Sequence, residues 1–389
     1  MRILIVHNVL WAHYKAKVFE ALAEQAATRP DTHVHVVQIA RNERARAGLE
    51  ASQPDAPTYR YPYTLLFDRF LEDVSLTEKT GALLRQARAF RPDVINLTGY
   101  YDPAQLVLLL YARLRGIRVV IQNESTAVDL VRNGPREWLK RRILGLADGF
   151  FCFGTRSVDY LLRLGVLPEQ ILVRQNAVVD NRALARVHAA ALPDRAATQQ
   201  ALGLRPRNFC YVGRLATPKN LPALLDAFAA ARRQAPDGNR WGLLLLGDGD
   251  QKEALARRIT DLNLTDAVRL VAGAPWYRVP AYLALADVLV LPSLSEPWGL
   301  VVNEAMVCGL PVVVSDRCGC ADDLVRPGEN GFIFAPEEPA ALTDRLLRCM
   351  DPQTDLPGMG AVSRQLIAAY APDVVAGEML DGFARVARR

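Results

Sequence analysis

Two glutamates in the segment SEPWGLVVNEAM, Glu296 and Glu304, lie on either side of a glycine. The apolar run after Gly299 predicts a short helix, so the amides of Leu300 and Val301 are unpaired donors at its start. A glycine there lets a ligand approach the backbone closely. Carboxylates in the loop and on the next helical turn can accept hydrogen bonds from the hydroxyls of a sugar. A bound sugar would therefore explain both glutamates without a metal ion.

Two cations follow an earlier strand candidate in the segment YVGRLATPKN, at Arg214 and Lys219. Thr217 and Pro218 match the cap and first position of a helix, which places Lys219 in its first turn. A cation is disfavoured at the positive end of a helix, unless a multiply charged anion occupies the site. Taken alone, each charge also fits a solvated surface residue. The two cations and two carboxylates together favour a site for a phosphorylated, hydroxyl-rich ligand.

The elements that would position these residues alternate between short apolar runs and amphipathic stretches, in two rounds. Such alternation predicts an α/β fold with two doubly wound parallel sheets. We expect an N-terminal domain over 1–180, a linker over 181–206, a second domain over 207–361, and a helical tail over 362–389 that packs back on the first domain. Ligands bind beyond the carboxyl ends of such strands, so the two domains are expected to face a cleft.

Composition narrows the class of protein. Half of the 389 residues are hydrophobic, which excludes global disorder, and the six cysteines are scattered as in a protein with reduced thiols. No segment is typical of a signal peptide or a membrane span, so we expect a cytoplasmic protein. The net charge of +5 arises within residues 1–150. This excess, with the basic run 140–142, fits peripheral contact with the inner membrane face, although an ordinary arginine-rich surface explains it too.

The motifs quoted above, with LLGDGD and ENGFIF, resemble the family 4 retaining glycosyltransferases of the GT-B fold. The resemblance is specific over most of residues 207–335 and fainter in the first domain. It implies that Arg214 and Lys219 bind the donor diphosphate and stabilise it as the leaving group. It further implies that Glu304 binds the ribose and Glu296 the transferred sugar. The remaining donor contacts that it implies are Gly249, Gly273, Trp298, Gly299, Leu300 and Val301.

The first domain departs from the family pattern. Relatives have a histidine near the donor sugar where this chain reads Gln122 to Ser125, so Asn123 or Glu124 must replace that contact or it is absent. Glu124 is also a possible nucleophile, although front-face attack, with the leaving phosphate accepting the proton, is favoured. His13 and Lys15 are the expected acceptor contacts, while His13 also fits a structural turn.

The function that follows is transfer of a sugar from a nucleotide diphosphate sugar to an acceptor hydroxyl, with retention and without cofactor or metal. The expected acceptors are a glycan, glycolipid or polyprenyl-linked saccharide in a bacterium, or a soluble metabolite; no nucleic-acid partner is expected. Three alternatives stay open: a GT-B nucleotide-sugar epimerase, a noncatalytic nucleotide-sugar-binding module, and a dinucleotide oxidoreductase. The dinucleotide oxidoreductase is disfavoured, because no GxGxxG turn follows the strand candidates of this sequence.

Overall fold

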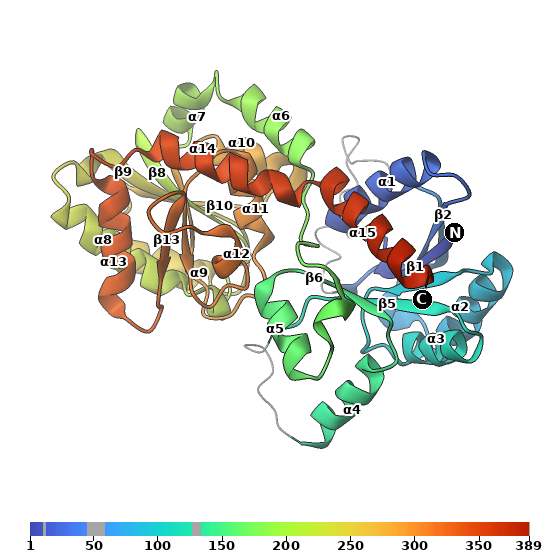
Figure 1. Cartoon of the computed structure of the whole chain (residues 1–389). Helices are drawn as coiled ribbons and strands as arrows, with labels where there is room; N and C mark the ends of the chain where they lie inside the picture. The colour runs from blue at the N-terminus through green and yellow to red at the C-terminus, as the bar shows by residue number, and fades with distance from the viewer. Residues whose placement is uncertain (11–12, 45–58, 127–133, 389) are drawn as a thin grey trace. The chain divides into compact units, whose positions relative to one another are not determined.

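The computed structural model describes residues 1–10, 13–44, 59–126 and 134–388. The chain forms two compact units (Figure 1). Unit 1 consists of Met1–Val179 and Tyr370–Arg389, and unit 2 consists of Asp180–Ala369. The predicted α/β class with two Rossmann-like parallel sheets is confirmed.

Unit 1 is built on a seven-stranded parallel sheet in the order β3-β2-β1-β4-β5-β6-β7. The central strands are continuous apolar runs because both of their faces are covered. The strands are β1 Arg2–Val9, β2 His33–Asn42, β3 Tyr63–Phe70, β4 Val94–Leu97, β5 Arg118–Asn123, β6 Gly149–Cys152 and β7 Ile171–Val173.

Helices cover both faces of this sheet. They are α1 His13–Ala27, α2 Leu76–Phe90, α3 Pro103–Leu114, α4 Pro135–Leu144, α5 Thr155–Arg163 and α15 Pro372–Ala387. Successive side chains of a strand point to opposite faces. Accordingly, Leu4 and Val6 of β1 pack with α2, α3 and α5, whereas Ile3 and Ile5 pack with α1 and α15.

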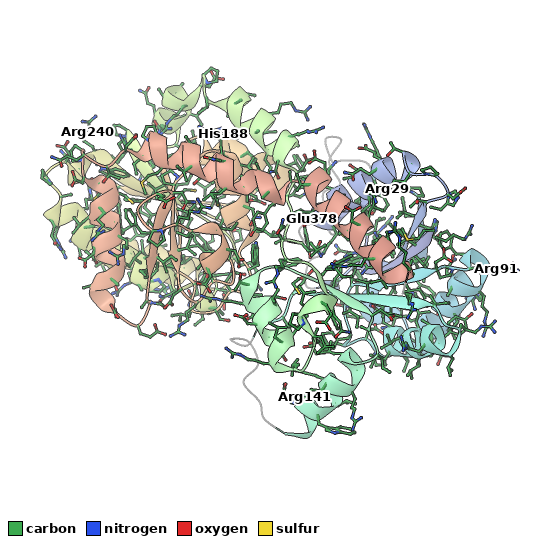
Figure 2. All side chains as sticks on the ribbon, viewed as in Figure 1. Arg29, Arg91, Arg141, His188, Arg240 and Glu378 are labelled. Atoms are coloured by element: carbon green, nitrogen blue, oxygen red, sulfur yellow. The ribbon has the colours of Figure 1, made fainter. Side chains whose placement is uncertain are left out.

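The helix α15 completes the core of unit 1, although it follows unit 2 in the chain. Its Phe383 is fully buried, with its ring 5.0 Å from that of Phe151 in β6. On the outer side, Arg29 of α1, which Figure 2 labels, forms an ion pair with Asp381 of α15 at 2.8 Å. The segment Tyr370–Arg389 is therefore part of the first folding unit.

Unit 2 is built on a six-stranded parallel sheet in the order β10-β9-β8-β11-β12-β13. Every residue of β9, β11 and β12 is buried, as expected for strands covered on both faces. The strands are β8 Arg207–Val212, β9 Trp241–Leu246, β10 Val268–Val271, β11 Val288–Leu291, β12 Val312–Ser315 and β13 Gly331–Phe334. The helices are α6 Asn181–Ala191, α7 Arg195–Ala201, α8 Leu221–Gln234, α9 Lys252–Asp261, α10 Val279–Leu283, α11 Leu300–Val307, α12 Ala321–Leu324, α13 Pro339–Met350 and α14 Leu356–Ile367.

The expected linker over 181–206 is structured: it contains α6 and α7, and it belongs to unit 2. The reason is packing, since Gln199 of α7 donates to the Leu285 carbonyl at 2.9 Å and Arg195 pairs with Asp287. The expected tail is divided, because α14 lies in unit 2 and only α15 lies in unit 1. The strands β3 and β13 were not anticipated. In β3 most residues are only partly buried, so its apolar signal is weak.

Two further expectations concern membranes and thiols. Across the described part of the chain, no helix is both long enough and apolar enough to cross a bilayer. All six cysteines are free and buried, as the sequence predicted for reduced thiols.

Candidate functional site

The loops that follow β8 and β9 in unit 2 are locked together through their backbones. The amide of Leu215 donates to Asp248 at 2.9 Å, and the amide of Gln251 donates to Leu215 at 3.0 Å. A Cβ on Gly249 would lie 2.3 Å from the Leu215 carbonyl oxygen, so only glycine fits there. Gly249, predicted as a donor contact, therefore also holds the loop that carries Arg214.

The neighbouring loop after β10 is fixed by the aspartate of the LLGDGD motif. The Asp248 carboxylate accepts the Gly273 amide at 2.7 Å and the Lys252 ammonium at 2.7 Å. These hydrogen bonds lower the pKa of Asp248, first through Lys252 and then through Gly273. Gly249 and Gly273, both predicted as donor contacts, thus lie on loops joined to each other at the carboxyl edge of the sheet.

A buried tyrosine organises the cationic loop. Tyr211 lies at the end of β8, is fully buried, and donates its hydroxyl to the Arg214 carbonyl at 2.8 Å. Burial raises the pKa of Tyr211; the Glu296 charge raises it further and the Arg214 charge lowers it. Both charges therefore lie near this hydroxyl. The Arg214 side chain is exposed and, within the described residues, makes no ion pair.

The predicted helix start at Thr217 is wrong. Thr217–Lys219 forms a short 3-10 turn, Asn220 adopts a left-handed conformation with φ of 55°, and α8 begins only at Leu221. The hydroxyl of Thr217 accepts the Gln251 side chain at 3.1 Å instead of capping a helix. Lys219 therefore ends a turn directly before the N-cap residue of α8, rather than lying in the first turn of that helix.

Lys219 and Glu296 form a direct ion pair, in which their side chains are 15% and 17% exposed. The loop contact that aligns them is the Leu294 amide, which donates to the Pro218 carbonyl at 2.8 Å. The fold thus brings together three of the four charged residues that the sequence predicted for the site. Lys219 and Glu296 are in contact, and both Glu296 and Arg214 lie near the hydroxyl of Tyr211.

The Glu296 loop rests on the segment after β12. The Glu296 amide donates to Arg317 at 3.3 Å, and its carbonyl accepts the Gly319 amide at 2.9 Å. The Cys320 amide donates to the Trp298 carbonyl at 3.1 Å. A second chain segment therefore fixes the first glutamate of the motif.

Trp298 is 4% exposed, and its indole nitrogen donates to Asn303 of α11 at 2.9 Å. Its ring is thus part of the core beneath the loop. The next residue, Gly299, has φ of 99° and precedes α11, as expected. The amides of Leu300 and Val301 begin α11, and their side chains are only partly buried. We interpret Trp298 as the anchor of the loop and the two amides as its ligand-facing donors.

Glu304 lies on the second turn of α11 and is partly buried. Burial raises the pKa of its carboxyl group to about 8. At neutral pH this group therefore holds a proton in the ligand-free protein, and it can both donate to and accept from hydroxyl groups.

This shift has a consequence for stability. An unfolded Glu304 loses its proton near its ordinary pKa of 4.5, whereas the folded one keeps it to about 8. The native state therefore holds the extra proton in this window, and the free energy of unfolding falls as the pH rises through it. We expect Glu304→Gln to remove this loss, about 4 kcal/mol between pH 5 and pH 8.5, measured by urea unfolding at these two pH values. Exposed Glu338→Gln is the control, and parallel curves for wild type and Glu304→Gln would contradict the assignment.

In unit 1, two predicted residues meet at the carboxyl edge of the sheet. Lys15 of α1 is 1% exposed, and its Nζ lies 3.1 Å from Oε1 of Glu124, which follows β5. The same ammonium donates to Gln122 at 2.8 Å and lies 4.5 Å from the centre of the Phe153 ring. Desolvation lowers the pKa of Lys15, although Glu124 raises it in part. Lys15 is thus a buried partner of Glu124.

Asn123, the other residue considered for the missing histidine contact, is 1% exposed and bonds Ser157 at 2.8 Å. Its side chain is held inside the fold, whereas the Glu124 side chain is 42% exposed. Glu124 is therefore the residue of this pair that a ligand can reach. His13 begins α1, and its side chain lies outside the described residues.

Sequence reasoning missed the residues that support the site, chiefly Tyr211 and Gly319. The only local signal for Tyr211 is its place two residues before the strand-ending glycine. Gly319 lies between two cysteines, and it allows the segment after β12 to pack closely against the Glu296 loop.

Comparison with known proteins agrees with this geometry. Residues 194–358 match the family described as "Glycosyl transferases group 1", and residues 16–177 match "Glycosyl transferase 4-like domain". An alpha-D-kanosaminyltransferase of Streptomyces kanamyceticus is 25% identical over 71% of this chain and 70% of its own length.

A GDP-mannose-dependent alpha-(1-6)-phosphatidylinositol monomannoside mannosyltransferase of Mycolicibacterium smegmatis is 34% identical, over 36% of this chain and 38% of its own length. The crystal structure of Anabaena HepE in complex with UDP and glucose has a TM-score of 0.72 and 19% identity, covering 99% of this chain and 100% of that one. This similarity shows the fold. The chain belongs to the family 4 glycosyltransferases of the GT-B fold.

Proposed function

We propose that this protein is a retaining, metal-independent glycosyltransferase that moves a sugar from a nucleotide diphosphate sugar to an acceptor hydroxyl. Unit 2 binds the donor and unit 1 binds the acceptor. The observation that carries the proposal is the cluster of Arg214, Lys219 and Glu296 beside the start of α11. Two cations and two helix amides match a diphosphate, and the carboxylates match sugar and ribose hydroxyls.

In the proposed reaction, the bond between the anomeric carbon and the phosphate oxygen breaks, and its electron pair stays on the phosphate. Arg214, Lys219 and the amides of Leu300 and Val301 stabilise that charge. The acceptor oxygen bonds the anomeric carbon on the same face, and its proton passes to the departing phosphate. Glu296 holds hydroxyls of the transferred sugar, and no covalent enzyme intermediate forms.

The relatives support retention and the biosynthetic setting. One is named as GDP-mannose-dependent and alpha-(1-6)-specific, and GDP-mannose itself carries an α linkage. Its named acceptor is a phosphatidylinositol monomannoside, which is a glycolipid. We therefore place this protein on the cytoplasmic side of bacterial polysaccharide or glycolipid biosynthesis.

The test combines binding with product analysis. We expect one UDP- or GDP-sugar from a panel to raise the melting temperature, because ligand binding stabilises the native state by mass action. NMR of the sugar released or transferred should show the donor's α configuration in the first product. Inverted configuration would contradict retention, release of an epimerised free sugar would favour the epimerase, and stabilisation without turnover would favour a binding module. A melting temperature that no nucleotide sugar changes would contradict the function.

We also propose peripheral contact with an anionic membrane through α4. Its Trp138 and Leu139 are 59% and 53% exposed, and Arg142 and Arg141, of which Figure 2 labels the latter, are exposed on the same helix. Exposed apolar and basic side chains on one helix fit the boundary between acyl chains and anionic headgroups. Lys140 contributes less, because it bonds Glu137 at 2.9 Å and the Tyr160 hydroxyl at 2.6 Å.

The membrane proposal is tested by co-sedimentation with phosphatidylglycerol vesicles. We expect the double variant Trp138→Ser/Leu139→Ser to lose most of its binding, because it removes the apolar surface. A variant at another exposed leucine, Leu192→Ser in unit 2, is the control. Equal sedimentation of the two variants and the wild type would contradict the proposal.

A further inference from the structure

We propose that the carboxyl edge of the unit 1 sheet carries a saccharide subsite, in which the Tyr101 ring is the stacking surface and Glu124 binds a hydroxyl. Lys15 is the positioning residue for Glu124. This inference rests on the proposed function, and it specifies that the reacting end of the acceptor is a sugar ring.

The first observation is an exposed, supported aromatic ring. Tyr101 follows β4 and is 55% exposed, whereas Tyr100 beside it is 3% exposed. The two rings are stacked with centroids 4.4 Å apart, and their hydroxyls are 3.1 Å apart. One face of Tyr101 is thus covered by a buried ring, and the residue is held rigidly with much of its surface in solvent. Rigid aromatic rings of this kind suit the apolar face of a pyranose.

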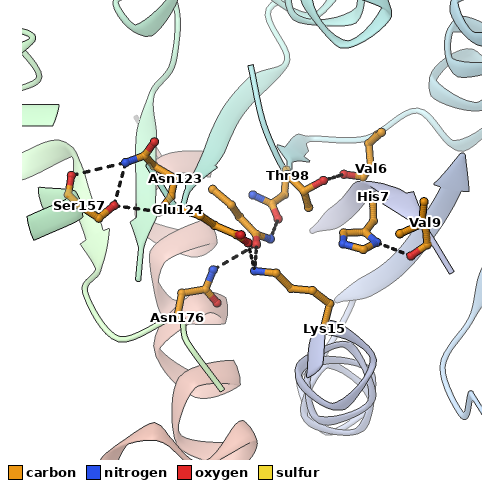
Figure 3. Close-up of polar contacts among 11 residues, drawn as sticks. Val6, His7, Val9, Lys15, Thr98, Asn123, Glu124, Ser157 and Asn176 are labelled. Carbon is orange, nitrogen blue, oxygen red and sulfur yellow. Dashed lines mark hydrogen bonds and ion pairs between the residues drawn. The ribbon is translucent and has the colours of Figure 1, made fainter. Parts of the chain in front are cut away.

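The second observation is a carboxylate fixed by a buried ammonium (Figure 3). Lys15 bonds Oε1 of Glu124 and the amide oxygen of Gln122. That amide oxygen also accepts Asn176 at 3.1 Å, and the Gln122 nitrogen donates to Asn96 at 2.7 Å. This buried network defines where the Lys15 ammonium lies, and the ammonium in turn defines where Glu124 lies.

Lys15 itself is not accessible to an acceptor. Its side chain is 1% exposed, and its ammonium contacts Gln122, Glu124 and the Phe153 ring. A ligand therefore contacts the half-exposed Glu124 carboxylate, which accepts hydrogen bonds from hydroxyl groups and repels anions. This chemistry favours a neutral, hydroxyl-rich acceptor end over a phosphate, and it revises the expected function of Lys15 from direct acceptor contact to positioning.

The two observations belong to one place in the fold. β4 and β5 are adjacent parallel strands, with Leu97 paired to Ile121, so the residues after them share one edge. The hydroxyl of Tyr100 also lies near the side chain of Ser125, which directly follows Glu124. The stacked tyrosines and the residues that follow β5 are thus neighbours at this edge. An aromatic surface beside a fixed carboxylate is the combination by which proteins bind sugars.

The experiment is saturation-transfer NMR on the full chain, with methyl α-glucopyranoside, methyl α-galactopyranoside and methyl α-mannopyranoside as probes, in the presence of UDP or GDP. We expect at least one glycoside to receive saturation from the wild type. Tyr101→Ala should weaken its binding by about three- to tenfold, and Tyr101→Phe should retain it, because the ring provides the contact. Tyr63→Ala, at another exposed tyrosine of unit 1, should leave the binding unchanged.

A double-mutant cycle separates positioning from stability. Lys15→Met should weaken glycoside binding no further when Glu124→Gln is already present, whereas its effect should add to that of Tyr101→Ala. Additive effects of Lys15→Met and Glu124→Gln would overturn the positioning assignment. If Lys15→Met fails to fold, Glu124→Gln and Tyr101→Ala still decide the subsite.

Failure of the subsite is distinct from failure of the proposed function. If UDP or GDP raises the melting temperature but no glycoside receives saturation, the subsite is wrong and donor binding stands. If glycosides bind equally well to wild type, Tyr101→Ala and Glu124→Gln, the subsite is also wrong. If neither nucleotide nor any nucleotide sugar changes the melting temperature, the proposed function fails.

Discussion

Lys219→Ala is expected to lower turnover by about 100- to 1,000-fold, which corresponds to about 2.7–4 kcal/mol of activation free energy. Lys219 is the cation in direct contact with Glu296 in the donor cluster, so its removal leaves the departing diphosphate with one fewer charge to stabilise it. The measurement is the initial rate of nucleoside diphosphate release from the nucleotide sugar that stabilises the protein. This assay detects donor hydrolysis as well as transfer, and it therefore needs no identified acceptor.

The matched control for Lys219→Ala is Arg258→Ala. Arg258 also forms an ion pair in unit 2, with Asp226 at 2.6 Å, but both side chains are more than 40% exposed and lie between α8 and α9. Exposed pairs contribute little to stability, so this variant should keep the wild-type rate and fold. A Lys219→Ala variant that keeps its melting temperature and works at the wild-type rate would remove the main support for the donor site.

Gly319→Ala is expected to abolish binding of the nucleotide sugar while leaving most of the fold intact. A Cβ on Gly319 would lie 1.9 Å from the Pro297 carbonyl oxygen, and backbone cannot move aside as a flexible side chain can. The Glu296 loop must then separate from the segment after β12, which breaks the hydrogen bond from Gly319 to Glu296. Calorimetric titration with the stabilising nucleotide sugar should show at least a hundredfold loss of affinity, or about 2.7 kcal/mol.

The control for this substitution is Gly99→Ala, because a Cβ on Gly99 meets no atom within 4 Å. It should bind the nucleotide sugar as tightly as the wild type does. If Gly319→Ala also binds normally, the segment after β12 does not position Glu296. If it unfolds instead, urea titration will show this, and Cys318→Ala then tests the same segment with a smaller change.

The sequence best predicted the features that depend on residues close together in the chain, such as the bounds of a helix. The start of α11 at Leu300 and its end before Gly309 follow from a glycine at each end of an apolar run. The sheets follow from repeated apolar segments with helical stretches between them. The same local reasoning was wrong at Thr217, where threonine followed by proline suggested a helix cap. There the chain makes a 3-10 turn and a left-handed residue before α8.

Local sequence patterns could not predict which distant segments contact each other. The pair formed by Lys219 and Glu296 spans β9, β10 and β11, and that formed by Lys15 and Glu124 spans four strands of the first sheet, β2 to β5. Both pairs depend on strand order, because parallel neighbours bring their carboxyl ends to one edge. The burial of Trp298 was likewise not readable from its neighbours, since an exposed loop and a buried anchor can share the sequence SEPWG.

The placement of α15 in unit 1 has a consequence for synthesis on the ribosome. Unit 2 is one uninterrupted stretch of chain and can acquire its core as soon as residue 369 has emerged. Unit 1 lacks Val375, Met379 and Phe383 until the segment after unit 2 has also been translated. Although its synthesis begins first, unit 1 is therefore expected to complete its core after unit 2, and until then the apolar surface that includes Phe19 and Phe151 lacks the helix that covers it.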